Sequence, residues 1–265
     1  MAQRAARATP PSAQGCPSRR SSRTRSAKSR RRRPGRRRTR GAKWASRSGG
    51  RMLSDEVWRE LRDQGAPRAF RERSVMLRQG SEGTHLLALT SGLAKVVHRA
   101  PGGVVTWLAF RGPGDLLGEV SVFHGTPRTA EVVALTPCTA VVLEAQRFRR
   151  FVDERGLVME LMREALHRLR ESDAQRTELL TLPLIVRLAR VLLRLAELTA
   201  AGVGPDGVRL TGLSQEEIAQ ATGVTRNAVI TGLQLLRESG AVETARKVII
   251  IRDMRALRDW ATAVR

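Results

Sequence analysis

The chain has 265 residues, enough for two domains, and carries 48 Lys and Arg residues against 25 Asp and Glu residues, a net charge of +23. The two cysteines are far apart and the four histidines are scattered, which excludes a disulfide framework and a clustered metal site. This cysteine usage indicates a reducing, cytoplasmic compartment. No apolar run reaches the roughly 18 residues that a membrane span needs, so we expect no membrane partner.

The positive charge is concentrated in an N-terminal tail. Residues 1–50 hold 17 basic residues and no acidic one, which leaves 31 basic against 25 acidic residues in the remainder, a net charge of +6. The Arg/Ser-rich composition predicts disorder over residues 1–51. The tail is either an arm that binds nucleic acid or a segment upstream of the natural start. We favour the second reading, because "MLSDEVWRELRDQG" from Met52 has Ser54 in place to cap a first helix.

Between residues 70 and 144 the chain consists of short apolar runs that turn signals interrupt. "HLLALTSG", "LAKVVHR", "VVTWLAF", "EVVALT" and "CTAVVLE" are typical strands, and glycine or proline clusters separate them. Close spacing of this kind predicts a compact antiparallel sandwich or jelly roll.

From Gln146 the apolar residues recur every three or four positions, which predicts one long helix to about Leu180. Its apolar stripe is narrow, a pattern that favours packing against a partner helix in a homodimer; the alternative is that the helix lies on the β domain. Pro183 then interrupts the pattern and can begin a new helix. The preceding "TLP" step is the expected hinge between domains.

The segment "LSQEEIAQATGVTRNAVITGLQLLRESGAV" predicts two short crossed helices. Ser214 and Glu217 have the spacing of a capping box, Gly223 permits the tight turn, and Thr225 can cap the second helix, which Gly240 ends. This pattern is typical of a helix-turn-helix, with "VETARKVIIIRD" as a β-hairpin wing; a generic αα-hairpin is the alternative.

The stretch "GEVSVFHGTPRTAEVVA" joins groups that could bind a phosphorylated sugar. Gly118 allows close approach of backbone N–H groups, the Glu119 carboxylate can accept from a hydroxyl, and the Arg128 guanidinium with Thr129 suits a phosphate. A β-turn with a surface ion pair is the other explanation of the same residues.

In this order, these segments resemble the cyclic-AMP receptor protein family of bacterial regulators (the Crp/Fnr family) over about residues 70–253. "LRQGSEGTHLLALTSGLAKV", "GDLLGEVSVFHGTPRTAEVVA" and "LSQEEIAQATGVTRNAV" carry the resemblance. It implies that Glu119 meets a ribose hydroxyl, that Arg128 meets a cyclic phosphate and that Thr129 assists. It also implies that the backbone of Gly118 and Val120 lies against the ligand.

The chain departs from the family's cyclic-AMP members at two places. Where those members place Thr-Ser against the adenine, the matching residues here are Ser172 and Asp173, and the second puts a carboxylate near the base. On the recognition helix, the family's Arg-Glu…Arg becomes Arg226, Asn227 and Thr231. Arg226 keeps the fork that reads guanine, but Asn227 prefers adenine, so we expect a different half-site.

We therefore predict an α+β protein: an N-terminal β-sandwich or jelly-roll cyclic-nucleotide-binding domain, a long dimerisation helix and a C-terminal winged helix-turn-helix. The predicted boundaries are 1–51 for the tail, 52–148 for the β domain, 149–182 for the helix and hinge, and 183–265 for the DNA-binding domain. The predicted DNA contacts are Ser214, Gln215, Thr225, Arg226, Asn227, Thr231, Arg246 and Lys247.

The predicted function is a homodimeric, ligand-gated regulator that binds double-stranded DNA and works with RNA polymerase, with cyclic AMP or another cyclic nucleotide as ligand. An enzyme is not expected, because no nucleophile is paired with a base. Two distant cysteines cannot hold the iron–sulfur cluster of the family's oxygen sensor, and no other metal is expected. Two alternatives are a ligand-independent regulator of the same fold and a non-specific, nucleoid-type DNA-binding protein.

Overall fold

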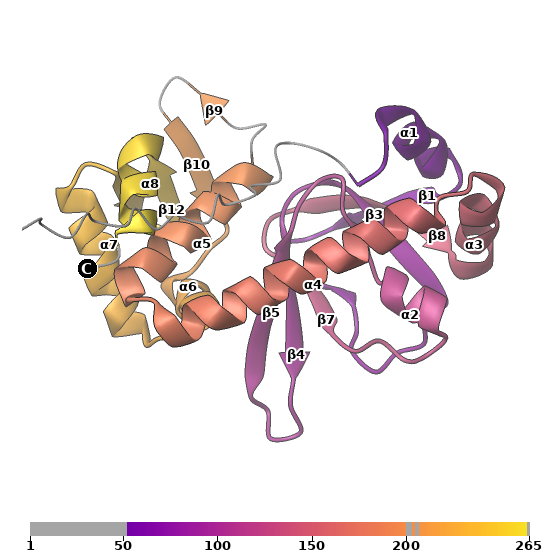
Figure 1. The fold of residues 1–265 in the computed structure, drawn as a ribbon, viewed down its shortest axis with the longest axis horizontal. Coiled ribbons are helices and arrows are strands. Elements are labelled where there is room, and N and C mark those ends of the chain that lie inside the picture. Colours follow the sequence, from indigo (N-terminus) through magenta and orange to yellow (C-terminus); the bar gives the residue numbers. More distant parts are fainter. Residues whose placement is uncertain (1–51, 200–202, 205–206, 264–265) are drawn as a thin grey trace, which may run out of the picture. The chain divides into compact units, whose positions relative to one another are not determined.

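A computed structural model describes residues 52–199, 203–204 and 207–263 (Figure 1). The predictions for the basic tail lie outside these described residues. The first helix, α1 (Asp55–Asp63), begins where Ser54 was expected to cap it, and the Ser54 side chain accepts a hydrogen bond from the Val57 N–H. Among the described residues, the strands form three four-stranded sheets.

Two of these sheets form the predicted sandwich. Their strand orders are β1-β8-β3-β6 and β2-β7-β4-β5, with antiparallel pairing throughout. The strands are β1 (Ala66–Phe70), β2 (Val75–Leu77), β3 (His85–Ser91), β4 (Ala94–Arg99), β5 (Val105–Arg111), β6 (Leu116–Leu117), β7 (Glu131–Ala134) and β8 (Cys138–Glu144).

Side chains from both sheets close the sandwich core. Leu87 and Leu89 of one sheet share a buried cluster with Ala94 and Val132 of the other. The alternate residues of β3, Leu86 and Ala88, belong to a second buried cluster, so both faces of this strand are covered. The short helix α2 (Glu119–His124) follows β6, so the "GE" pair lies at the end of the shortest strand of its sheet.

The prediction of one continuous helix from Gln146 is wrong. The chain forms α3 (Ala145–Glu154) and then α4 (Val158–Thr181), with Gly156 between them at φ +63°. This left-handed conformation is open to glycine and ends the first helix. Phe148 and Phe151 of α3 are buried with Leu86 and Leu143, so this helix belongs to the β-domain core.

Helix α4 keeps the exposed apolar side chains that the narrow stripe predicted. They are Val158, Met159, Met162, Leu166, Leu169, Leu179 and Leu180. Glu178 near its end is buried and pairs with Arg190, at 3.2 Å, and with Arg194, both on α5 (Leu184–Leu198). A buried carboxylate held by two guanidinium groups fixes the joint between α4 and α5.

The C-terminal domain contains the predicted winged helix-turn-helix. Its elements after α5 are β9 (Val203–Gly204), β10 (Gly207–Thr211), α6 (Gln215–Thr222), α7 (Arg226–Glu238), β11 (Val242–Ala245), β12 (Val248–Ile251) and α8 (Met254–Thr262). Gly223 takes φ +64° in the turn between α6 and α7, as the close crossing requires. Strands β11 and β12 pair antiparallel and form the wing.

Candidate nucleotide pocket and DNA-binding surface

Gly118 occupies a position that only glycine fits. Its φ is +86°, and a Cβ built on it would collide with Nη1 of Arg128 and crowd Leu77. Gly118 therefore allows two things: the chain turns from β6 into α2, and the Arg128 side chain lies against the backbone. The close neighbour of Gly118 in this structure is the Arg128 side chain, and the approach of a ligand to this backbone stays a prediction.

Arg128 is buried, with 4% of its surface exposed. Its guanidinium donates to the carbonyl oxygen of His85 at 2.6 Å and to that of Gly118 at 3.5 Å. Burial lowers the pKa of Arg128, while the Glu119 carboxylate acts in the opposite direction. A buried guanidinium held by neutral carbonyl oxygens remains available to an anion, because charge-assisted bonds to phosphate are stronger than bonds to carbonyls.

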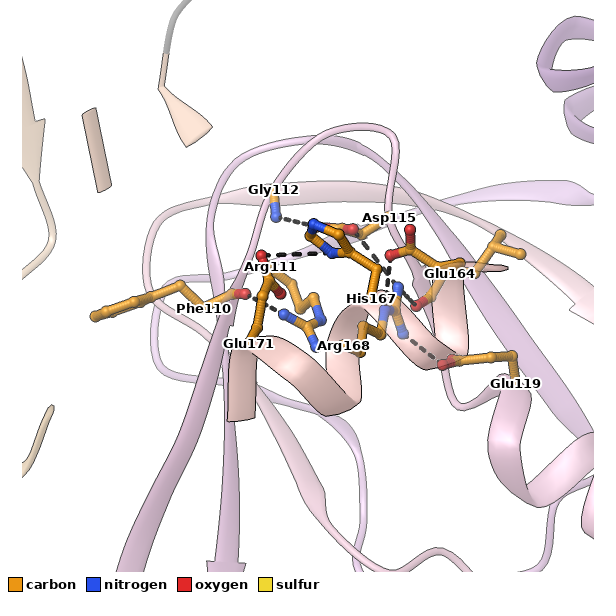
Figure 2. Close-up of polar contacts among 10 residues, drawn as sticks. Phe110, Arg111, Gly112, Asp115, Glu119, Glu164, His167, Arg168 and Glu171 are labelled. Carbon is orange, nitrogen blue, oxygen red and sulfur yellow. Dashed lines mark hydrogen bonds and ion pairs between the residues drawn. The ribbon is translucent and has the colours of Figure 1, made fainter. Parts of the chain in front are cut away.

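Glu119 has a partner that the sequence did not predict. Its carboxylate pairs with Nη1 of Arg168 on α4 (Figure 2). The same guanidinium donates to Glu164 at 2.9 Å and to the Leu116 carbonyl oxygen at 3.2 Å, and it lies 3.5 Å from Asp115. The only sequence signal was the four-residue spacing between Glu164 and Arg168 on a predicted helix.

The environment of Arg168 favours its charge. Burial alone would lower the pKa of Arg168, but the carboxylates of Glu119, Asp115 and Glu164 outweigh burial and raise it. A permanently charged group on α4 therefore ties this helix to the residue that resemblance assigns to the ribose.

Of the remaining predicted pocket residues, Thr129 directly follows Arg128 in the chain, while Val120, Ser172 and Asp173 make no hydrogen bond to the Arg128 side chain within the described residues. Val120 and Thr129 are exposed, on α2 and after Arg128 respectively. Ser172 is half-buried on α4; Asp173 is exposed, and among the described residues its recorded polar contacts are with Arg176 and Thr177 of the same helix. The structure thus brings Gly118, Glu119 and Arg128 together and leaves the other positions open.

The predicted capping box of α6 is present. The Ser214 hydroxyl accepts from the Glu217 N–H at 3.2 Å, and the Glu217 carboxylate accepts from the Ser214 N–H at 2.8 Å. The Thr225 hydroxyl accepts from the Ala228 N–H and caps α7 as predicted. Local hydrogen bonds of this kind fix where each helix begins.

The N-terminal end of α7 presents the predicted base-reading residues to solvent. Arg226 and Asn227 are exposed in the first turn, and Arg226 donates to the Gln215 side chain at 3.2 Å. Thr231, one turn on, is also exposed, while Val229 and Leu233 on the opposite face are buried in the domain core.

The wing ends in two exposed cations, Arg246 and Lys247, in the turn between β11 and β12. Lys247 adopts φ +59° there, which the tight hairpin turn demands. Within the described ranges no group of three or more His, Cys, Asp or Glu side chains could hold a metal ion, and no helix there is long and apolar enough to cross a membrane.

Comparisons with known proteins identify both domains. Residues 67–155 match the family described as cyclic nucleotide-binding domain, and residues 186–260 match the Crp-like helix-turn-helix domain. The CRP-like cAMP-activated global transcriptional regulator of Mycobacterium tuberculosis is 31% identical over 199 residues, which cover 74% of this chain and 88% of that protein. The cAMP-activated regulator CRP of Pasteurella multocida is 26% identical over 184 residues, 69% of this chain and 88% of that protein.

A solved structure supports the same assignment. The crystal structure of a CRP-family transcriptional regulator from Thermus thermophilus superposes with a TM-score of 0.63 at 30% identity, covering 74% of this chain and 97% of that one. The similarity therefore extends over the sandwich, the long helix and the DNA-binding domain together.

Proposed function

This chain belongs to the CRP family of DNA-binding transcription regulators, and we propose that a cyclic nucleotide, cyclic AMP or a close relative, gates it from the β domain. The family and the matched domains indicate a regulator rather than an enzyme. As a protein that acts on the chromosome, it would work in the cytoplasm, and its expected protein partner is RNA polymerase.

Arg128 is the observation that carries the ligand proposal. Arg128 is 4% exposed, and among the described residues its side chain donates to backbone carbonyls alone. Burying a cation in this way is costly unless an anion joins it. The cyclic phosphate would take over these donors. Glu119 would accept from the ribose hydroxyl, Thr129 and the backbone of Gly118 and Val120 would complete the phosphate side, and the base would extend toward Ser172 and Asp173 on α4.

The exposed apolar residues of α4 support a homodimer. Seven large apolar side chains of this helix are exposed in the single chain, among them Met162, Leu166 and Leu169. A second copy of α4 would bury them and set two α7 helices about 34 Å apart, one DNA turn. In each half-site, Arg226, Asn227 and Thr231 would face base edges.

The other predicted DNA contacts have supporting roles in this proposal. Thr225, Ser214 and Gln215 lie near helix N-termini, where backbone N–H groups attract phosphate. Arg246 and Lys247 on the wing would meet phosphates, which position the protein without reading sequence.

The proposal is tested by isothermal titration of the full-length protein with cyclic AMP and cyclic GMP. Arg128→Ala should lower the affinity by roughly two to four orders of magnitude, because it removes charge-assisted bonds worth about 1.5–3 kcal/mol each. Glu119→Ala should cost less, since this carboxylate would meet only a hydroxyl. Arg62→Ala, an exposed arginine on α1, is the control and should bind as the wild type does.

One observation favours a second candidate, a regulator of the same fold that needs no ligand. Both Glu119 and Arg128 already have protein partners, Arg168 and the His85 carbonyl oxygen. If the wild-type protein binds neither nucleotide and still protects specific genomic sites in a footprint, this candidate replaces our proposal.

A further inference from the structure

A second arginine of the β domain lacks a strong partner. Arg111 ends β5 and is half-buried. Within the part of the chain that the structure describes, the recorded hydrogen bond of its guanidinium is to the Phe110 carbonyl oxygen, at 2.8 Å. A guanidinium carries five N–H donors, so most of the hydrogen-bonding capacity of Arg111 is unused.

Nearby carboxylates only partly offset the effect of burial on the pKa of Arg111. Burial lowers the pKa of Arg111 and the Arg168 charge lowers it further, while Asp115, Glu119 and Glu171 act in the opposite direction. Asp115 and Glu119 are the carboxylates that Arg168 engages directly (Figure 2). Arg168 thus takes the close contacts of these two carboxylates, and the unused N–H donors of the half-buried Arg111 are open to an acceptor from outside the chain.

Arg111 lies where the nucleotide base is expected. Figure 2 shows it beside Arg168 and Glu171 of α4. Glu171 directly precedes Ser172, and Arg168 holds Glu119, the expected ribose contact. A ligand whose ribose meets Glu119 and whose base reaches α4 near Ser172 would bring its base edge within the region of Arg111.

We propose that Arg111 reads the base of the bound nucleotide and that the preferred ligand carries guanine, as in cyclic GMP. The inference rests on the proposed cyclic-nucleotide pocket. Guanine presents two acceptors side by side, O6 and N7, which match the arginine fork. Adenine presents N7 beside an amino group, which is a donor and cannot bond to a guanidinium. The carboxylate of Asp173 suits the remaining guanine donors on the opposite edge.

The test compares three ligands that share ribose and cyclic phosphate: cyclic GMP, cyclic IMP and cyclic AMP. Cyclic IMP keeps O6 and N7 but lacks the exocyclic amine of guanine, so it isolates the edge that Arg111 would read. By isothermal titration, the wild type should bind cyclic GMP and cyclic IMP about tenfold more tightly than cyclic AMP, which is within the range of one bidentate arginine–guanine contact.

Arg111→Lys keeps the positive charge and loses the planar fork. It should remove the preference for oxo purines: the affinity for cyclic GMP and cyclic IMP should fall about tenfold, and the affinity for cyclic AMP should stay unchanged. Arg209→Lys, an exposed arginine on β10, is the matched control and should keep the wild-type ratios.

The possible outcomes distinguish a failure of base reading by Arg111 from a failure of the proposed nucleotide pocket. Failure of the wild type to bind any of the three nucleotides would overturn both. Tight binding of cyclic AMP without preference for the oxo purines leaves the pocket standing and refutes the reading by Arg111. An equal loss for all three ligands in Arg111→Lys would make Arg111 a purely structural cation, which also refutes it.

Discussion

Arg168→Ala should be strongly destabilising. The arginine side chain is 16% exposed, and those of its partners Asp115, Glu119 and Glu164 are 3%, 17% and 13% exposed. Removing the cation leaves three carboxylates close together and largely out of water. Breaking a buried ion pair by deleting one partner costs about 3–5 kcal/mol, and we expect a loss in this range at neutral pH.

The assay is urea unfolding at a fixed protein concentration, because a homodimer's stability depends on concentration. Arg163→Ala on the same helix is the control: its side chain is 74% exposed, lies 3.9 Å from Glu160 and should cost less than about 0.5 kcal/mol. If the free energy of unfolding falls by the same small amount in both variants, the ion pairs of Arg168 do not anchor α4.

Three further predictions concern DNA binding and the helix-turn-helix. Arg226→Ala should relax base preference at one position of each half-site in a selection from randomised sites, whereas Lys247→Ala should lower the affinity for all sequences alike. If Arg226→Ala also lowers the affinity for all sequences equally, Arg226 does not read a base. Deleting residues 1–51 should flatten the salt dependence of binding and keep site preference. Ser214→Ala should cost about 1 kcal/mol in urea unfolding. Burial would raise the pKa of Glu217, but bonds from Ser214 and Lys95 lower it, so the capping-box stabilisation is present above the ordinary glutamate pKa and is lost as the pH falls through the folded value.

Local sequence determined the elements whose hydrogen bonds join near neighbours. The capping box at Ser214, the Thr225 cap and the turn at Gly223 were all predicted, because each depends on residues three or four apart. The sandwich followed from short apolar runs that glycine and proline turn signals separate, because closely spaced strands of this kind pair with their neighbours in the chain. The break at Gly156 escaped prediction, since apolar residues continue at helical spacing on both sides of it.

The candidate pocket was only partly contained in the sequence. Its residue types, Gly118, Glu119 and Arg128, could be recognised from a seventeen-residue stretch. Their partners could not: Arg128 donates to a carbonyl 43 residues away, and Glu119 pairs with Arg168, 49 residues away. Such contacts exist only once the sheets have closed and α4 has packed beside them, because burial removes water as a competing partner and makes each charge depend on what folding brings within reach.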